Sequence, residues 1–341
     1  MIKNRPIRNT FVRVFLTLLG LVVDTSAADM KITPFSTSNQ SPLVQIHGIP
    51  RDTAADITPV GTFDMRLAHD LSSNYAVSNS ASERITLDGE IYRTTVSVRY
   101  GVARNWEAGI EIPYVFHGGG FLDNFIIGWH STFTLPQGGR NNAPKNRLNY
   151  SYQKNGIQKI QMDHTISGLG DLSLTGGVNL YDGNDSGLQD RVSLKAAIKL
   201  PTGDSTQFLG SGSTDVALLL CGGINRYTEW GSLGLFGSVG ALAMTRGDLL
   251  PDQQKHIAGL ATLGAGWGPA SWISFKVQLN GSTPLYGASS LAEISKSPML
   301  LILGGALRFP EEYSLDIGVG EDVAVNTAPD VSFYLGLNKR F

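Results

Sequence analysis

The sequence predicts an all-β fold, a transmembrane antiparallel β-barrel of about 12 strands with a helical insertion in one long extracellular loop. Three observations predict it. Apolar and polar residues alternate along twelve stretches, short and long connections alternate between these stretches, and aromatic residues gather at the short-connection end. Each strand of such a barrel sets one row of side chains against lipid and the other against the lumen. A soluble β-sandwich, the competing interpretation, gives no reason to gather aromatic residues at one end.

The N-terminus has the three parts of a secretory signal peptide over residues 1–28. They are a positive region (Lys3, Arg5, Arg8 and Arg13), an apolar run at 14–23 and a small-residue cleavage site at 25–28. The apolar run is too short to span a bilayer as a helix. We therefore expect cleavage after Ala28 and a location in a bacterial outer membrane.

The composition fits a barrel and excludes one class of partner. Hydrophobic residues make up 42% of the chain, and the 40 glycines suit strands that must bend and close. A formal net charge of −2 excludes phosphate-backbone binding as a main role, so no nucleic-acid partner is expected. The chain has one cysteine, Cys221, and therefore no internal disulfide.

Residues 29–60 are rich in Pro, Ser, Asn and Gln and lack sustained periodicity. We interpret them as a periplasmic lead-in segment, with a position folded up into the lower lumen as the alternative. The barrel itself occupies 61–341. Its strands are expected at 61–70, 85–100, 105–115, 169–181, 190–201, 213–226, 231–244, 256–267, 271–282, 298–309, 313–321 and 330–341.

The connections give the orientation of the barrel. The links after the second, sixth, eighth and tenth strands are a few residues long, whereas the alternate links are longer. Short turns face the periplasm and long loops the outside. The aromatic residues at the short-turn end form an interfacial girdle; they are Tyr100, Trp106, Tyr181, Tyr227, Trp230, Trp267, Trp272, Phe309, Tyr313 and Phe341. The terminal Phe341 also matches the signal that such barrels present to their assembly machinery.

The inward rows predict two different lumen walls. The first five strands place charges of both signs inside, namely Asp64, Arg66, Arg93, Arg99, Glu107, Glu111, Lys195 and Lys199. Because an unpaired buried charge is costly, these residues should pair, either as a structural network or as a selectivity surface for a polar solute. Strands six to eight instead carry small or apolar inward residues, such as Leu219, Cys221 and Leu242. Something apolar should cover that wall, either a plug or a bound amphiphile.

The long loop at 118–168 offers a plug. Its segment 121–133 has an apolar stripe at helical spacing, which predicts a short helix. The proposed plug residues are Phe121, Leu122, Asp123, Phe125, Ile126, Trp129, His130 and Phe133. We expect this helix to enter the barrel mouth and pack on the apolar wall. The alternative is a helix that lies on the outer-leaflet surface.

Two histidines are weak catalytic candidates. His69 lies on an outward row near the outer end of the first strand, a place that resembles the lipid-facing site of the outer-membrane phospholipase barrel. The residue two positions on is Leu71, so the same-face nucleophile is missing. His117 flanks the loop helix. No two histidines stand at a short ligand spacing, so we expect neither a metal site nor a cofactor.

Several short motifs spread over nearly all of the mature chain resemble the pattern of an uncharacterised proteobacterial family of outer-membrane β-barrels. They are NQSPL (39–43), GIP (48–50), LDGE (87–90), PYVFH (113–117), GGFLD (119–123), WH (129–130), GGR (138–140), KLPTGD (199–204), GSG (210–212) and ED (321–322). The resemblance implies the barrel fold and the outer-membrane location. It implies no activity, because the family is a domain of unknown function.

These observations together predict a narrow or gated channel for a small or amphiphilic solute. A lipid- or lipopolysaccharide-modifying enzyme and a structural or surface-interaction barrel remain as alternatives, and an enzyme is the less favoured. Expected partners are outer-membrane lipids and lipopolysaccharide, the barrel-assembly machinery during insertion, and a periplasmic partner of unknown identity for 29–60.

Overall fold

Twelve antiparallel strands close into a barrel, which confirms the predicted fold class. The computed structural model describes residues 30–133, 139–185, 187–324 and 326–341, so the predicted signal peptide lies outside the described residues. Each barrel strand pairs with the next along the chain, and β1 pairs with β15 to close the ring. The strands are β1 (Phe63–Asn79), β2 (Glu83–Ala103), β3 (Trp106–Gly118), β7 (Ser173–Asp185), β8 (Leu188–Lys199), β9 (Asp215–Thr228), β10 (Gly231–Met244), β11 (Ile257–Ala270), β12 (Ile273–Ser282), β13 (Met299–Arg308), β14 (Tyr313–Asp322) and β15 (Val331–Arg340).

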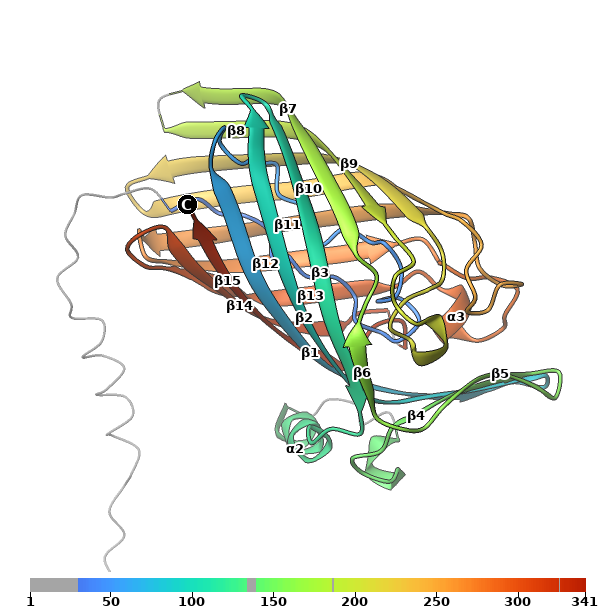
Figure 1. Cartoon of the computed structure of the whole chain (residues 1–341). Coiled ribbons are helices and arrows are strands. Elements are labelled where there is room, and N and C mark those ends of the chain that lie inside the picture. The colour runs from blue at the N-terminus through green and yellow to red at the C-terminus, as the bar shows by residue number, and fades with distance from the viewer. Residues whose placement is uncertain (1–29, 134–138, 186, 325) are drawn as a thin grey trace, which may run out of the picture.

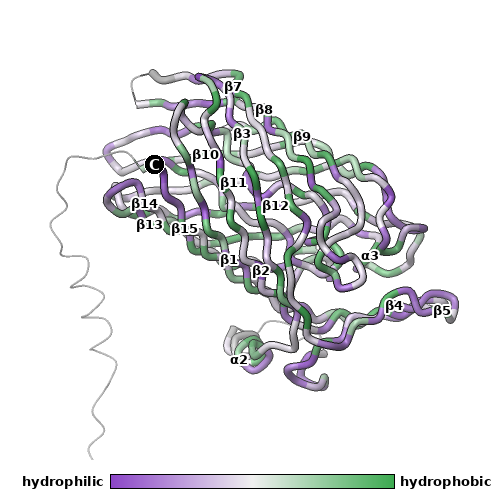
Figure 2. Tube along the Cα trace, in the orientation of Figure 1, coloured by the Kyte–Doolittle hydropathy of each residue, from purple (hydrophilic) through white to green (hydrophobic). Residues whose placement is uncertain are grey.

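The outer surface of the barrel is apolar. Along β9, Val216, Leu218 and Leu220 are exposed, whereas the intervening Ala217 and Leu219 are buried in the lumen. Figure 2 shows hydrophobic residues along the barrel strands and hydrophilic ones at their ends. Soluble monomers rarely expose contiguous apolar surface on this scale, so lipid is the solvent of this face. None of the described helices is long and apolar enough to cross a bilayer.

The two ends of the barrel differ as predicted. At the short-turn end, links of two to four residues join β2 to β3, β7 to β8, β9 to β10, β11 to β12 and β13 to β14. Exposed aromatic side chains ring this end, including Trp106, Trp230, Trp267, Trp272 and Phe341. The backbone of Phe341 exchanges two hydrogen bonds with Phe63, which closes the seam. The opposite end is the long-loop end.

A sheet covers the long-loop end. Instead of the expected link at 71–84, β1 and β2 continue past the barrel as a long hairpin, and β4 (Asn149–Lys154) and β5 (Ile157–Met162) extend this hairpin into a sheet. We call this extension the cap. Its inner face packs on loops that hold η2 (Ser205–Gln207) and α3 (Ala292–Ser295), through buried residues that include Ile85, Tyr150, Tyr152, Phe208, Tyr286, Leu291 and Ile294. The short β6 (Ile166–Leu169) pairs with the outer part of β3.

The loop helix lies outside the barrel, which corrects the predicted plug helix. Helix α2 (Asp123–Phe133) forms where the apolar stripe predicts it. Leu122 and Ile126 pack on the lipid-facing row of β1, β14 and β15, and the Phe125 ring lies 6.0 Å from that of Phe333. Asp123 at its start pairs with Arg140 in η1 (Arg140–Asn142), and Phe121 is 63% exposed. The side chains of Trp129, His130 and Phe133 lie outside the described set.

The N-terminal segment occupies the lumen instead. The periplasmic position of 29–60 is therefore wrong, and the alternative, a segment folded up into the lumen, is what residues 30–58 show. Residues 30–58, which we call the plug, run through the barrel interior (Figure 1). The plug crosses the lumen twice, and on both crossings its backbone bonds to side chains of the wall and not to a neighbouring strand. Its sequence therefore has no strand periodicity. The chain leaves the lumen at Val60, which bridges Gly101 beside the short-turn end.

Candidate functional site

The plug enters and leaves through the short-turn end. On the way in, the Ile32 amide donates to Asn225 Oδ1 at 2.7 Å, and the Phe35 amide donates to Gln278 Oε1 at 2.7 Å. A turn at residues 41–47 reverses the chain beneath the cap. On the way out, the Thr58 amide and hydroxyl both donate to Glu107 Oε2 at 2.8 Å. The plug therefore crosses the lumen twice.

The tip of the plug covers the apolar wall. Leu43, Val44 and Ile46 share one buried cluster with Leu219 and Leu242 of the wall and with the inner face of the cap. This confirms that something apolar covers strands β9 to β11 on the inside, although the covering segment is not the predicted helix. Because plug tip, wall and cap form a single cluster, the cap rests partly on the plug.

Three polar contacts fix the tip. The Gly48 amide donates to Asp215 Oδ2 at 2.7 Å, and His47 Nε2 lies 2.9 Å from the Tyr286 hydroxyl. Arg93 of β2 donates to Gln45 Oε1 at 2.9 Å. A Cβ at Gly48 would lie only 2.8 Å from the Asp215 Cβ, so glycine is required for this close approach.

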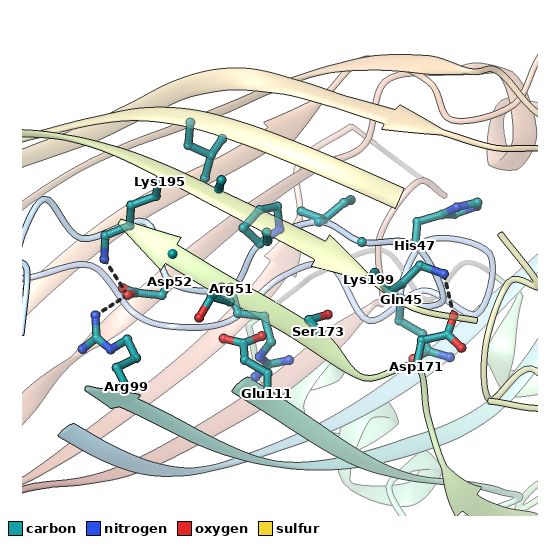
Figure 3. Close-up of a pocket in the computed structure, with 18 of the residues that line it drawn as sticks. Gln45, His47, Arg51, Asp52, Arg99, Glu111, Asp171, Ser173, Lys195 and Lys199 are labelled. Atoms are coloured by element: carbon teal, nitrogen blue, oxygen red, sulfur yellow. Dashed lines mark hydrogen bonds and ion pairs between the residues drawn. The ribbon is translucent and has the colours of Figure 1, made fainter. Parts of the chain in front are cut away.

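Buried ion pairs hold the outgoing pass. Arg51 pairs with Asp70 of β1, and both side chains are at most 4% exposed. Asp52 lies between two wall cations: Arg99 Nη1 and Lys195 Nζ reach its Oδ2 at 2.5 and 2.7 Å (Figure 3). Burial alone would raise the pKa of the Asp52 carboxyl, but Arg99 and Lys195 outweigh it and hold that pKa well below its usual range.

The predicted charged wall is a lumen surface, and most of it binds the plug. Arg99, Glu107, Lys195 and Asp64 form one network, in which Glu107 Oε1 lies 3.3 Å from Lys195 and Asp64 Oδ1 lies 3.2 Å from Arg99. The other members lie apart: Arg66 donates to Ser36, Arg93 to Gln45 and Lys199 to Asp171, and Glu111 lines a cavity beside Arg93.

Spaces remain between the plug and the barrel wall. A cavity of about 50 Å³ lies between the plug and the charged wall, and Figure 3 shows Glu111, Lys195 and Lys199 around it. A second cavity of about 40 Å³, lined without charged side chains, lies on the apolar side. A vestibule of about 730 Å³ opens at the short-turn end. Arg99 lines both the vestibule and the charged cavity, so the two spaces adjoin at its side chain.

Comparisons with known proteins place the chain in a family. The model of a family described as "Protein of unknown function (DUF3187)" matches residues 11–341. The chain belongs to this family. No curated protein matches the sequence significantly.

Among solved structures, this DUF3187 protein is similar to the COG4313 outer-membrane channel from Pseudomonas putida F1. The identity is 15% over 84% of this chain and 98% of that chain, with a TM-score of 0.53. The translocator domain of the autotransporter NalP from Neisseria meningitidis has 13% identity over 84% of this chain and 91% of that chain, with a TM-score of 0.41. The first likeness confirms the outer-membrane barrel fold, whose short-turn end faces the periplasm.

The structure gives His69 and His117 no catalytic partners among the described residues. His69 Nδ1 lies 2.9 Å from the Thr94 hydroxyl on the lipid-facing side. His117 is fully buried against Tyr150 and Phe208, and its Nε2 contacts the Phe208 carbonyl at 3.1 Å. No metal-ligating cluster exists among the described residues.

Sequence reasoning missed the plug residues that pair with charges of the wall, chiefly Arg51, Asp52 and Asp56. A signal for them existed. The charged inner rows required counter-charges, and Asp56 supplies one to Arg191 at 2.6 Å. Residues 29–60 had been assigned to no strand or helix, and they carry the carboxylates Asp52 and Asp56.

Proposed function

We propose that this protein is an outer-membrane channel for a small or amphiphilic solute, closed at rest by residues 30–58, and that residues 1–28 are a cleaved signal peptide. The observation that carries the proposal is the plug itself. A lumen with one charged wall and one apolar wall is filled by a segment that contributes no strand to the barrel and joins it covalently only before β1.

The size of the barrel supports this function. Barrels of eight strands fill their interior with their own side chains, whereas those of 16 to 18 strands leave an aqueous channel. A barrel of twelve strands lies between these sizes. A chain that crosses the lumen twice occupies the excess width, and its departure would leave a passage lined by charges on one side and by small apolar residues on the other.

The plug can move without unfolding the barrel. Its contacts with the wall are side-chain hydrogen bonds, ion pairs and one apolar cluster, and the interstrand ladder does not include it. Because the cap packs on the tip of the plug, movement of the plug also removes support from the cap. The vestibule at the periplasmic end gives solutes access up to Arg99.

Single-channel conductance in planar bilayers tests this function. The test variant lacks residues 31–57, and heat-modifiable migration on gels checks that the barrel is folded. We expect large, steady conductance from this variant and low or flickering conductance from the intact protein. The matched control replaces the 118–139 segment, which includes α2, with a short Gly/Ser loop. It should behave like the intact protein, because α2 lies outside the wall. A folded but silent deletion variant would contradict the channel and favour a structural barrel.

A further inference from the structure

The pairing of Asp52 marks a carboxylate-binding position deep in the lumen. A single oxygen of Asp52 accepts from Arg99 Nη1 at 2.5 Å and from Lys195 Nζ at 2.7 Å. Its other oxygen accepts from the Ala54 amide within the plug. Both cations belong to the wall, whereas the carboxylate belongs to the removable segment. The plug therefore presents to the wall the same group that an organic acid would present.

The wall does not neutralise these cations by itself when the plug leaves. Glu107 is shared between them, at 3.6 Å from Arg99 and 3.3 Å from Lys195. Asp64 is shared between Arg99 and Arg340. An under-compensated cation inside a narrow lumen is costly, so an anion should replace Asp52 in the open state. A guanidinium with a neighbouring ammonium suits a planar carboxylate.

The residues that line the cavities around this position indicate the chemistry of the rest of the ligand. The charged cavity runs past Arg99 and Lys195 and is also lined by Leu219, which lines the uncharged cavity on the other side of the plug. Leu43 and Val44 of the plug cover this apolar wall and share one buried cluster with its Leu219. The plug thus offers a carboxylate to one wall and apolar side chains to the other. A ligand that replaces it should have both features.

We propose that Arg99 and Lys195 bind the carboxylate of a small amphiphilic organic acid during passage, and that Asp52 of the plug occupies this site in the closed state. The apolar body of the acid then lies against the wall that the plug tip covers at rest. This inference rests on the channel function proposed above and names its solute class.

Benzoate tests the site in the channel that lacks residues 31–57. Added benzoate should reduce the chloride current in a saturable way, whereas benzyl alcohol, its neutral analogue, should not. In the Arg99→Gln/Lys195→Gln double variant, the half-blocking concentration should rise about tenfold or more, the loss expected for hydrogen bonds to a charged group. Lys276→Gln is the matched control, because Lys276 faces the lumen from β12 and pairs there with Asp316 at 2.6 Å. Its half-blocking concentration should stay that of the parent.

The outcomes separate the two proposals. A folded but silent deletion variant overturns the channel itself. A conducting variant that benzoate does not block, or blocks equally well after both substitutions, overturns the carboxylate site and leaves the channel standing. A second readout uses the full-length protein: benzoate, but not benzyl alcohol, should accelerate the labelling of the lumen residue Cys221 by an impermeant maleimide. Equal labelling rates with both compounds would contradict the proposal that Asp52 occupies the carboxylate site in the closed state.

Discussion

Leu43→Ala should weaken docking of the plug and increase the undocked population by an amount that the structure allows us to estimate. Leu43 is 1% exposed and lies in the cluster formed by the plug tip, the wall and the cap. Truncating a fully buried leucine to alanine costs about 2–5 kcal/mol, because apolar contact is lost and a cavity remains. The strand ladder of the barrel does not include this residue, so the cost falls on docking of the plug. A cost of about 3 kcal/mol corresponds to a roughly 150-fold larger undocked population.

The native Cys221 reports that population. It is the one cysteine of the chain, is fully buried, and shares the cluster with plug residues that include Ala55. When undocking and redocking are fast, the rate of maleimide labelling follows the fraction of open molecules. We therefore expect Leu43→Ala to be labelled roughly 150-fold faster than the parent.

The matched control is Leu263→Ala, the same truncation at a lipid-facing position that is 61% exposed. Its labelling rate should equal that of the parent. Equal rates in all three proteins would refute the argument that the plug shields the lumen. An equal increase in both variants would show that labelling reports barrel loosening instead.

Three further predictions concern the same docking. Asp70→Asn leaves Arg51 buried without its charge partner and should raise the labelling rate of the lumen cysteine at least tenfold, whereas the Arg51→Met/Asp70→Leu double variant should fall back toward the parent rate. Gly48→Val places a Cβ 2.8 Å from the Asp215 Cβ and should open the channel in conductance recordings without loss of the folded barrel. The intact channel should stay closed from pH 7 to pH 5, because the docked pKa of Asp52 is depressed. A depressed carboxyl pKa stabilises docking above the undocked value of about 4 and loses this effect only as the pH falls further; opening between pH 7 and pH 5 in single-channel recordings would contradict the pairing.

The sequence predicted the spanning strands well because their pattern has a local physical cause. Successive side chains of a spanning strand face the lipid and the lumen in turn, which gives the sequence a period of two. The predicted strand 231–244 accordingly coincides with β10 (Gly231–Met244). The outer part of β1, residues 74–79, lacks that pattern because it lies beyond the ring of barrel strands and pairs with β2 alone. Its strand conformation depends on pairing with β2 and on the cap, and neither is encoded locally.

The plug was assigned to the wrong segment for a similar reason. The apolar stripe of 121–133 correctly predicts a helix, but a barrel wall offers an apolar surface both to the lipid and, at β9 to β11, to the lumen. An amphipathic helix could pack on either of these two surfaces, so its sequence pattern does not predict which one it contacts. Residues 30–58 have no period, because their hydrogen bonds go to side chains such as Asn225, Gln278 and Glu107, contributed by three different strands. Because the lack of a period fits a periplasmic and a lumen position equally, the sequence left both positions open for 29–60.

A reversible cross-link between plug and wall tests the central claim most directly. A Cβ at Gly223 would lie 3.8 Å from the Ala55 Cβ, the mean separation in disulfides, so Ala55→Cys and Gly223→Cys should bond. The recordings use these substitutions with Cys221→Ser and Leu43→Ala, so that the reduced plug undocks often. We predict silence under oxidising conditions and conductance bursts after addition of dithiothreitol. The same conductance before and after reduction, with the cross-link verified by mass spectrometry, would contradict closure by residues 30–58.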